Sequence, residues 1–160
     1  MQAPPAVLAA LELVPIPRPF DLDAYMRQVQ RVRGRRVHLH ELPATAAGAI
    51  CGLWLATEKA DHIYVAPGAT GVLRVNILLH EISHMLLGHG RADEAAAALA
   101  RLLHGGGNTQ GVRARYDSTE ERHAEMLATL ILTRASEPAQ TGDGLSMLEN
   151  VMGYGIPERW

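Results

Sequence analysis

Cysteine is almost absent from this sequence. Cys51 is the only one in 160 residues, so the chain has no intramolecular disulfide and no cysteine cage for a metal ion. The absence of disulfides fits a reducing compartment, and we expect a cytoplasmic protein. Any bound metal ion would have to be held by histidine and carboxylate side chains.

Long apolar runs and an excess of positive charge are also missing. No uncharged apolar stretch approaches the roughly 20 residues that span a bilayer. The apolar run near residue 6 has no basic flank before it, unlike a secretory signal. A formal net charge of −2 separates the chain from strongly basic nucleic-acid binders. We therefore expect neither a membrane partner nor direct nucleic-acid binding.

Aromatic residues make up only 4% of the chain, against 48% hydrophobic residues in all. The core must therefore be built from aliphatic side chains and alanine, which favours packed helices. The length fits one domain. Prolines at every second position from 15 to 19 predict an extended N-terminal lead-in over residues 1–20. Residues 21–136 should form the domain, and residues 137–160 a C-terminal tail packed on it.

Local patterns predict an α+β fold. Asp21 and Gly34 are typical of the start and end of a helix over residues 21–33. Three runs of strand-like residues follow, which we expect to form a small antiparallel three-stranded sheet. This sheet should pack against a helix over residues 72–87 and against further helices. The strand-like runs are residues 36–42, 51–57 and 62–66.

Two clusters of polar residues precede the helix over residues 72–87. His38 and His40 alternate with apolar residues in a predicted strand, so both should lie on its outer face. Five arginines between positions 27 and 36 are interpreted as a solvated basic face. They are Arg27, Arg31, Arg33, Arg35 and Arg36.

The segment HEISH, residues 80–84, lies in the predicted helix over residues 72–87. Positions four apart stack on one helix face, so His80 and His84 can present two nitrogen atoms to one metal ion. Glu81 lies beside them and could act as the general base that takes a proton from a water molecule. These residue types at this spacing indicate a zinc peptidase centre.

A catalytic zinc ion needs a third protein ligand. The capping-box pattern from Ser118 to Glu121 predicts a helix over residues 118–135, in which Glu121 and Glu125 share one face with two alanines. Small residues on that face would let the helix approach His80 and His84 closely. The spacing favours Glu121 as ligand and Glu125 as a second-shell residue that orients a ligand imidazole, and the reverse assignment stays open.

Other residues remain candidates near the metal. His123 points away from the face shared by the two glutamates and ranks third as a ligand. The oxyanion formed during peptide hydrolysis could be stabilised by His123, Tyr116, His89 or His104, and spacing does not choose among them. His89 follows Gly88 and is interpreted as a helix C-terminal residue that the helix dipole favours.

Together these motifs resemble the ImmA/IrrE family of small zinc metallopeptidases. The first family motif reads HEISHMLLGH at residues 80–89, and the second reads EERHAEMLATLIL at residues 120–132. The resemblance covers residues 21 to about 134. There are two departures, since His123 stands where the family often has a second glutamate, and residues 131–133 replace its usual Leu-Met-Pro.

The resemblance implies a gluzincin-like, zincin-like domain with one Zn²⁺. By position, the family's third zinc ligand falls on Glu121, beside His80 and His84, with Glu81 as the catalytic residue. The family's asparagine position is occupied by Glu125.

The function implied is that of a zinc-dependent endopeptidase acting on a protein substrate. The family's substrate is a helix-turn-helix transcriptional repressor, and here it would be a separate protein, because this chain has too little basic helix left for a DNA-binding unit. We expect the substrate to bind as an added strand along residues 62–66. The alternative is a zinc-containing regulatory module, or a toxin–antitoxin-type component, that binds a repressor without cutting it.

Overall fold

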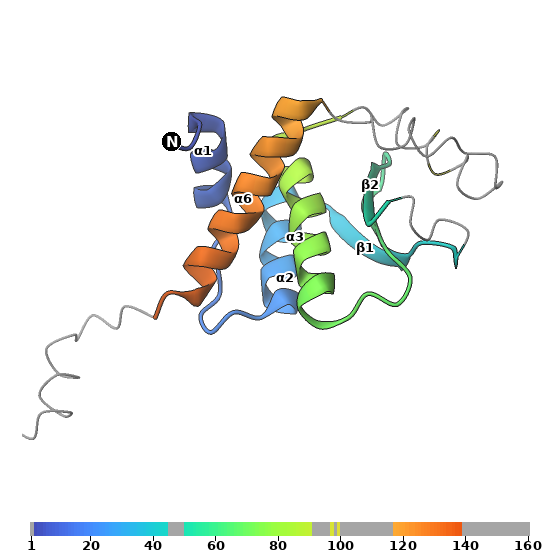
Figure 1. Cartoon of the computed structure of the whole chain (residues 1–160), viewed down its shortest axis with the longest axis horizontal. Coiled ribbons are helices and arrows are strands. Elements are labelled where there is room, and N and C mark those ends of the chain that lie inside the picture. The colour runs from blue at the N-terminus through green and yellow to red at the C-terminus, as the bar shows by residue number, and fades with distance from the viewer. Residues whose placement is uncertain (1, 45–49, 91–96, 98, 100–116, 139–160) are drawn as a thin grey trace, which may run out of the picture.

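The structure is a computed structural model that describes residues 2–44, 50–90, 97, 99 and 117–138. The described part has an α+β architecture in which helices pack against one small sheet (Figure 1). Within it, no helix combines the length and the apolar character needed to cross a bilayer. The helices are α1 (Pro5–Leu13), α2 (Leu22–Arg33), α3 (Gly71–Leu87) and α6 (Ser118–Ser136), and the strands are β1 (Arg36–Glu41), β2 (Gly52–Ala56) and β3 (Ala60–Val65).

Helix α2 has the boundaries that its sequence predicts. The side chain of Asp21 accepts a hydrogen bond from the backbone N–H of Ala24 at 2.6 Å, which caps the first turn. Gly34 ends the helix with a φ of 64°, a conformation that glycine adopts without steric cost. The buried face of α2 carries Tyr25, Met26 and Val29.

The lead-in predicted over residues 1–20 is only partly extended, because residues 5–13 form helix α1. Pro5 occupies its first turn, where the missing N–H and the fixed φ of proline are well tolerated. Val7 and Leu11 are buried on the face that packs against α6 and α3. The three later prolines, at positions 15, 17 and 19, lie after α1 in a segment that is not helical.

The sheet is mixed, so the prediction of an antiparallel sheet is wrong. The strand order is β1-β3-β2, with β2 antiparallel and β1 parallel to β3. Residues 57–59 are too few for anything but a hairpin between β2 and β3, whereas residues 42–51 leave room for β3 to lie between β1 and β2. Because β3 is central, it has no free edge and cannot take the added substrate strand expected along residues 62–66.

One face of the sheet packs on α3, which in turn packs on α6. Gly52 lies on this inner face, opposite Val65 in the register of β2 and β3. A Cβ atom built on Gly52 would lie 2.8 Å from Ile77 and 2.8 Å from Glu81, both of α3. The glycine therefore allows the backbone of β2 to approach α3 closely.

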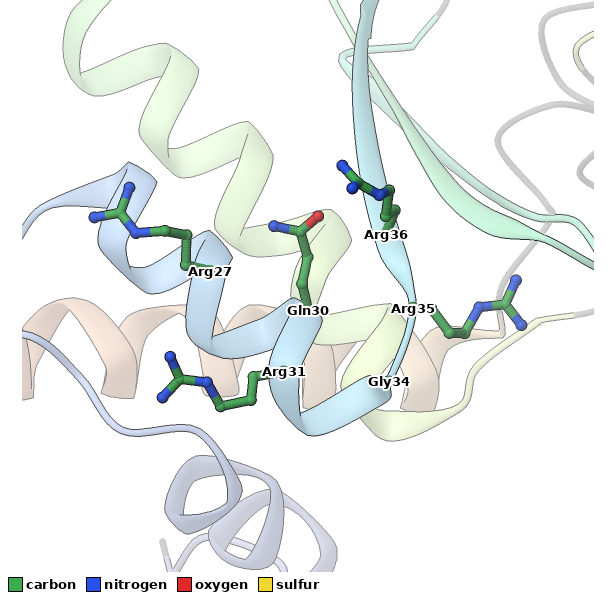
Figure 2. Close-up of a pocket in the computed structure, with 6 residues that line it drawn as sticks. All are labelled: Arg27, Gln30, Arg31, Gly34, Arg35 and Arg36. Atoms are coloured by element: carbon green, nitrogen blue, oxygen red, sulfur yellow. The ribbon is translucent and has the colours of Figure 1, made fainter.

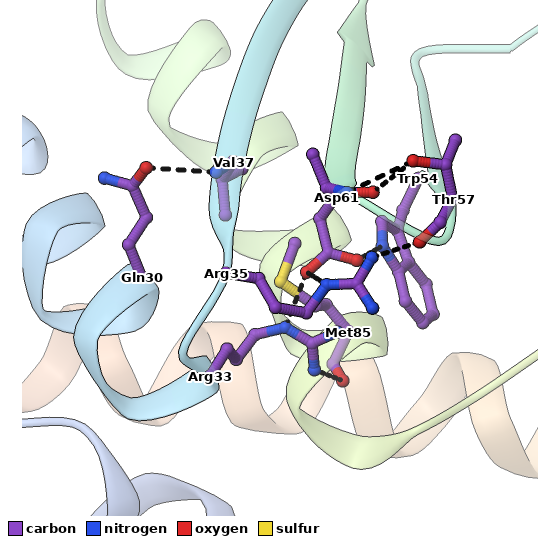
Figure 3. A network of polar contacts seen from close by, with 9 residues as sticks. Gln30, Arg33, Arg35, Val37, Trp54, Thr57, Asp61 and Met85 are labelled. Atoms are coloured by element: carbon purple, nitrogen blue, oxygen red, sulfur yellow. Dashed lines mark hydrogen bonds and ion pairs between the residues drawn. The ribbon is translucent and has the colours of Figure 1, made fainter.

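A buried carboxylate, Asp61 of β3, ties several elements together (Figure 3). It accepts hydrogen bonds from Arg33 Nε at 2.7 Å and from Trp54 Nε1 at 3.1 Å. Arg33 also donates to the backbone carbonyl of Met85 near the end of α3, at 3.2 Å. Arg35 lies 3.6 Å from the same carboxylate and donates to the carbonyl of Thr57.

The basic face predicted between residues 27 and 36 is therefore divided. Arg33 turns inward to Asp61, while Arg27, Arg31 and Arg36 surround a shallow surface depression of about 430 Å³ (Figure 2). This division was not apparent from the sequence, because the buried partner of Arg33 lies on a strand 28 positions away.

Candidate metal centre

Helix α3 carries the first three residues of the site. Its buried residues include Glu81 and His84, whose exposed fractions are 4% and 0%. Gly88 ends the helix with a φ of 68°, and its N–H meets the carbonyls of His84 and Met85. The helix thus ends three residues after His84, and residue 89 turns back toward His84.

Helix α6 carries Glu121, and its cap differs by one residue from the predicted one. The N-cap is Asp117 rather than Ser118, and the carboxylate of Asp117 accepts hydrogen bonds from the N–H groups of Thr119 and Glu120. Glu120 completes the capping box by accepting from the N–H of Asp117. The shift matters for the site, because it leaves the carboxylate of Glu121 available to the histidines of α3.

The two helices approach each other through small side chains, as their sequence predicts. Ala124 and Ala128 of α6 are both buried. Leu127 and Ile131, also buried, extend the same contact region along the helix. A larger side chain at position 124 would push α6 away from α3 and carry Glu121 out of reach of His80 and His84.

The structure brings His80, His84 and Glu121 together. The Nε2 atoms of the two histidines lie 3.1 Å apart. One carboxylate oxygen of Glu121 lies 3.3 Å from His80 Nε2 and the other lies 3.3 Å from His84 Nε2. Among the described residues, this is the one group of three or more such side chains whose ligand atoms are gathered closely enough to hold a metal ion.

These separations fit a zinc ion. Tetrahedral zinc, with bonds of about 2.0–2.1 Å to nitrogen or oxygen, sets its ligand atoms about 3.3–3.4 Å apart. The two histidine nitrogens, 3.1 Å apart, and the nearest oxygen to each of them, a different oxygen of Glu121 at 3.3 Å in each case, lie close to that spacing. The site is also open on one side, since the side chains of His80 and Glu121 are 31% and 43% exposed while His84 is buried.

The protonation of the three groups follows from their contacts. Hydrogen bonds from His80 and His84 lower the pKa of Glu121 far below its usual range. The same contact with Glu121 raises the pKa of His80, whereas burial lowers the pKa of His84. The pKa values of the two histidines shift in opposite directions because His84 is fully buried and His80 is partly exposed. A neutral His84 beside an ionised Glu121 is the state that binds a cation.

His89 has a role that its sequence position did not reveal. Its Nδ1 lies 3.0 Å from His84 Nδ1, within hydrogen-bond distance, and its ring is nearly buried. A partner on Nδ1 fixes the ring of His84 and leaves Nε2 directed at Glu121 and His80. Gly88 was the signal in the sequence for this role of His89. A glycine with left-handed backbone conformation reverses the direction of the chain at that point.

The other candidate residues lie further from the gathered ligand atoms. Glu125 is exposed and acts on His80 through its charge, which contributes to raising the pKa of His80. His123 is half-buried, with its ring 6.5 Å from that of His89, and it is not one of the three gathered ligands. His104, Tyr116 and residues 139–160 of the predicted tail lie outside the described residues.

Fold and site define an α+β domain with a candidate two-histidine, one-glutamate metal centre between two helices. Comparison of the chain with protein-family models, curated proteins and solved structures gave no match.

Proposed function

We propose that the chain is a zinc-dependent endopeptidase with a zincin-like fold that hydrolyses a peptide bond in a protein substrate. The observation that carries this proposal is the convergence of His80, His84 and Glu121 at zinc-ligand spacing, with Glu81 next to the two histidines on α3. The open side of the site, at His80 and Glu121, is where a substrate carbonyl and a water molecule would enter. A purely structural zinc site would be closed by a fourth protein ligand.

His80, His84 and Glu121 would hold the zinc ion, which when bound would act as a Lewis acid toward a water molecule and the substrate carbonyl. Glu81 accepts the proton of the attacking water and returns it to the leaving amine. Its burial against Gly52 of β2 keeps the carboxylate in one position and away from bulk solvent. His89 holds the ring of His84 in the orientation that ligation requires.

The substrate strand is placed along β2 in this proposal. β2 is an edge strand, and its Gly52 lies against Glu81. An extended peptide paired with the edge of β2 that no described strand occupies would bring its backbone near the catalytic glutamate, with main-chain hydrogen bonds holding it in place. A separate helix-turn-helix repressor is the proposed substrate, on the basis of the resemblance of residues 80–89 and 120–132 to the ImmA/IrrE family.

The variant Glu81→Gln tests the proposal. Glutamine keeps the shape of the side chain but cannot take the proton, so cleavage should fall by about 10²- to 10⁴-fold while zinc content stays unchanged. Cleavage is measured on a library of peptides by mass spectrometry of the new N-termini, and zinc by elemental analysis. Glu58→Gln, at an exposed turn, is the matched control.

Two results would contradict the proposal. Cleavage that persists in the Glu81→Gln variant would show that Glu81 is not the base. A zinc-loaded wild-type protein that binds a repressor and releases it from DNA without cutting it would instead support the non-cleaving regulatory module.

A further inference from the structure

The outer face of the sheet, opposite α3, carries a second cluster of histidines. His38 of β1 lies opposite His62 of β3, and His40 lies opposite Tyr64. The ring centroids are 5.3 Å apart for His38 and His62, 5.1 Å for His40 and His62, and 4.7 Å for His40 and Tyr64. Three imidazoles thus form one continuous group on an exposed surface.

Two ring nitrogens in this group already have the spacing of metal ligands. His40 Nε2 and His62 Nδ1 lie 2.9 Å apart. Two nitrogen atoms bonded to one ion at about 2.0–2.1 Å are about 2.9 Å apart when the bond angle is 90°, and about 3.3–3.4 Å apart at the tetrahedral angle. The observed spacing therefore matches neighbouring ligands of a square-planar or tetragonal ion, the geometry typical of Cu²⁺ and Ni²⁺.

A metal binds imidazole in its neutral form. Partial burial and the neighbouring His40 and His38 lower the pKa of His62, which favours that form of this ring. Without a metal, one of the two facing nitrogens must carry the proton of their hydrogen bond. Ligation by both lone pairs requires that proton to move to the other nitrogen of its own ring, which changes the tautomer and not the charge.

His38 can supply a third ligand. It is two positions from His40 on the same strand face, and its side chain is exposed. In the structure its ring stacks on His62, so it must turn about its side-chain torsions to join the other two nitrogens. The rings of His38 and His40 stack on that of His62, and His40 also stacks on Tyr64, which leaves fewer ring faces free. This disfavours a platform for nucleic-acid bases, which stack on free ring faces.

We propose that His40 and His62, joined by His38, form a surface site for a Cu²⁺ or Ni²⁺ ion on the outer face of the sheet. The site shares no residue with the His80, His84 and Glu121 centre and does not depend on the proposed peptidase activity. The remaining positions of the ion would be filled by water or by a ligand from another molecule.

Copper broadening of amide signals in the nuclear magnetic resonance spectrum tests the site. Substoichiometric CuCl₂ is added to the zinc-loaded full chain, and the paramagnetic Cu²⁺ should erase the signals of residues 38–40 and 62–64. His40→Ala and His62→Ala should each weaken this binding by at least about tenfold, the loss that even outer-shell partners of a metal cause. His38→Ala should have a smaller effect. Glu41→Gln, whose side chain projects from the opposite face of β1, is the matched control and should change nothing.

The far-ultraviolet circular dichroism of each variant establishes that it is folded, and His62→Gln replaces His62→Ala if the alanine variant is not. Broadening confined to the surroundings of His80, His84 and Glu121 would overturn the proposal. Broadening of β1 and β3 that is unchanged in His40→Ala and in the His62 variant would overturn it as well.

Discussion

Two polar clusters touch helix α3, one around the buried Asp61 and one at the partly exposed His80, His84 and Glu121, and they differ in how their charges are balanced. The carboxylate of Asp61 meets a permanent cation, Arg33, at 2.7 Å, and an indole N–H from Trp54. The other cluster gathers His80, His84 and Glu121, which are all electron-pair donors once deprotonated. The first cluster is balanced by the protein's own groups, whereas the second has the composition of a site for an added cation. The Asp61 cluster therefore contributes to structure and the histidine cluster is the candidate for chemistry.

Among the variants that test this difference between the two clusters, Glu121→Ala should have the largest effect, a loss of zinc affinity. The binding free energy of a structural zinc site is roughly 10–16 kcal/mol, shared among four ligands. Losing one ligand should therefore weaken zinc binding by about 10²- to 10³-fold. Glu125→Ala, one turn further along α6, should retain nearly all the zinc. Competition with a zinc-binding dye measures both affinities. Equal losses in the two variants would mean that α6 contributes charge rather than a ligand.

A substitution in the Asp61 cluster should lower the stability of the fold and leave zinc binding unchanged. Asp61→Asn leaves Arg33 and Arg35 without their counter-charge, which should lower the free energy of unfolding by about 2–3 kcal/mol. Zinc affinity of the folded variant should be unchanged. Urea denaturation measures the loss, and Glu12→Gln, which breaks an exposed ion pair with Arg134, should cost less than about 1 kcal/mol. Loss of zinc binding in folded Asp61→Asn would show that the two clusters are coupled.

Gly52→Ala tests how closely the sheet must approach Glu81. The added methyl group would lie 2.8 Å from side-chain atoms of Glu81 and Ile77, so β2 and α3 must separate slightly. We expect a loss of about 1–2 kcal/mol in the free energy of unfolding. The displaced Glu81 should lower the cleavage rate more than it lowers zinc affinity. Gly34→Ala is no control, because its positive φ adds strain of another kind.

The smallest effect concerns pH. The pKa of His80 is raised by Glu121, so the metal-free protein takes up a proton at His80 at a higher pH than an ordinary histidine would, and zinc must displace that proton. Zinc affinity should therefore weaken with falling pH, by less than about tenfold for each proton and pH unit. Glu121 stays ionised over this range and adds no competition. Zinc affinity that does not change between pH 7.5 and 5.5 would contradict this assignment.

The sequence predicted helices α2, α3 and α6 well, because their signals are local. Asp21, Gly34 and Gly88 mark helix ends directly, and the four-residue spacing of His80 and His84 places them on one face. Glu121 could be proposed because Ala124 and Ala128 signal close approach of a second helix. For these elements, short-range pattern and final structure agree.

The sheet topology and the supporting residues could not be predicted in the same way. The parallel pairing of β1 with β3 depends on contacts between strands distant in sequence, which no local pattern specifies. Helix α1 is stabilised by tertiary packing, since Val7 and Leu11 are buried and the helix contacts α6 and α3. No local sequence pattern reveals these contacts. Gly52 and His89 acquire their roles only once α3 is in place.

The unequal exposure of the three candidate ligands has a kinetic consequence. His84 is closed off from solvent, whereas His80 and Glu121 face it. A metal ion would therefore enter and leave along one route, meeting His80 or Glu121 first and His84 last. A chelator must use the same route, so a substrate analogue bound over Glu121 should slow zinc extraction without changing the strength of any zinc bond.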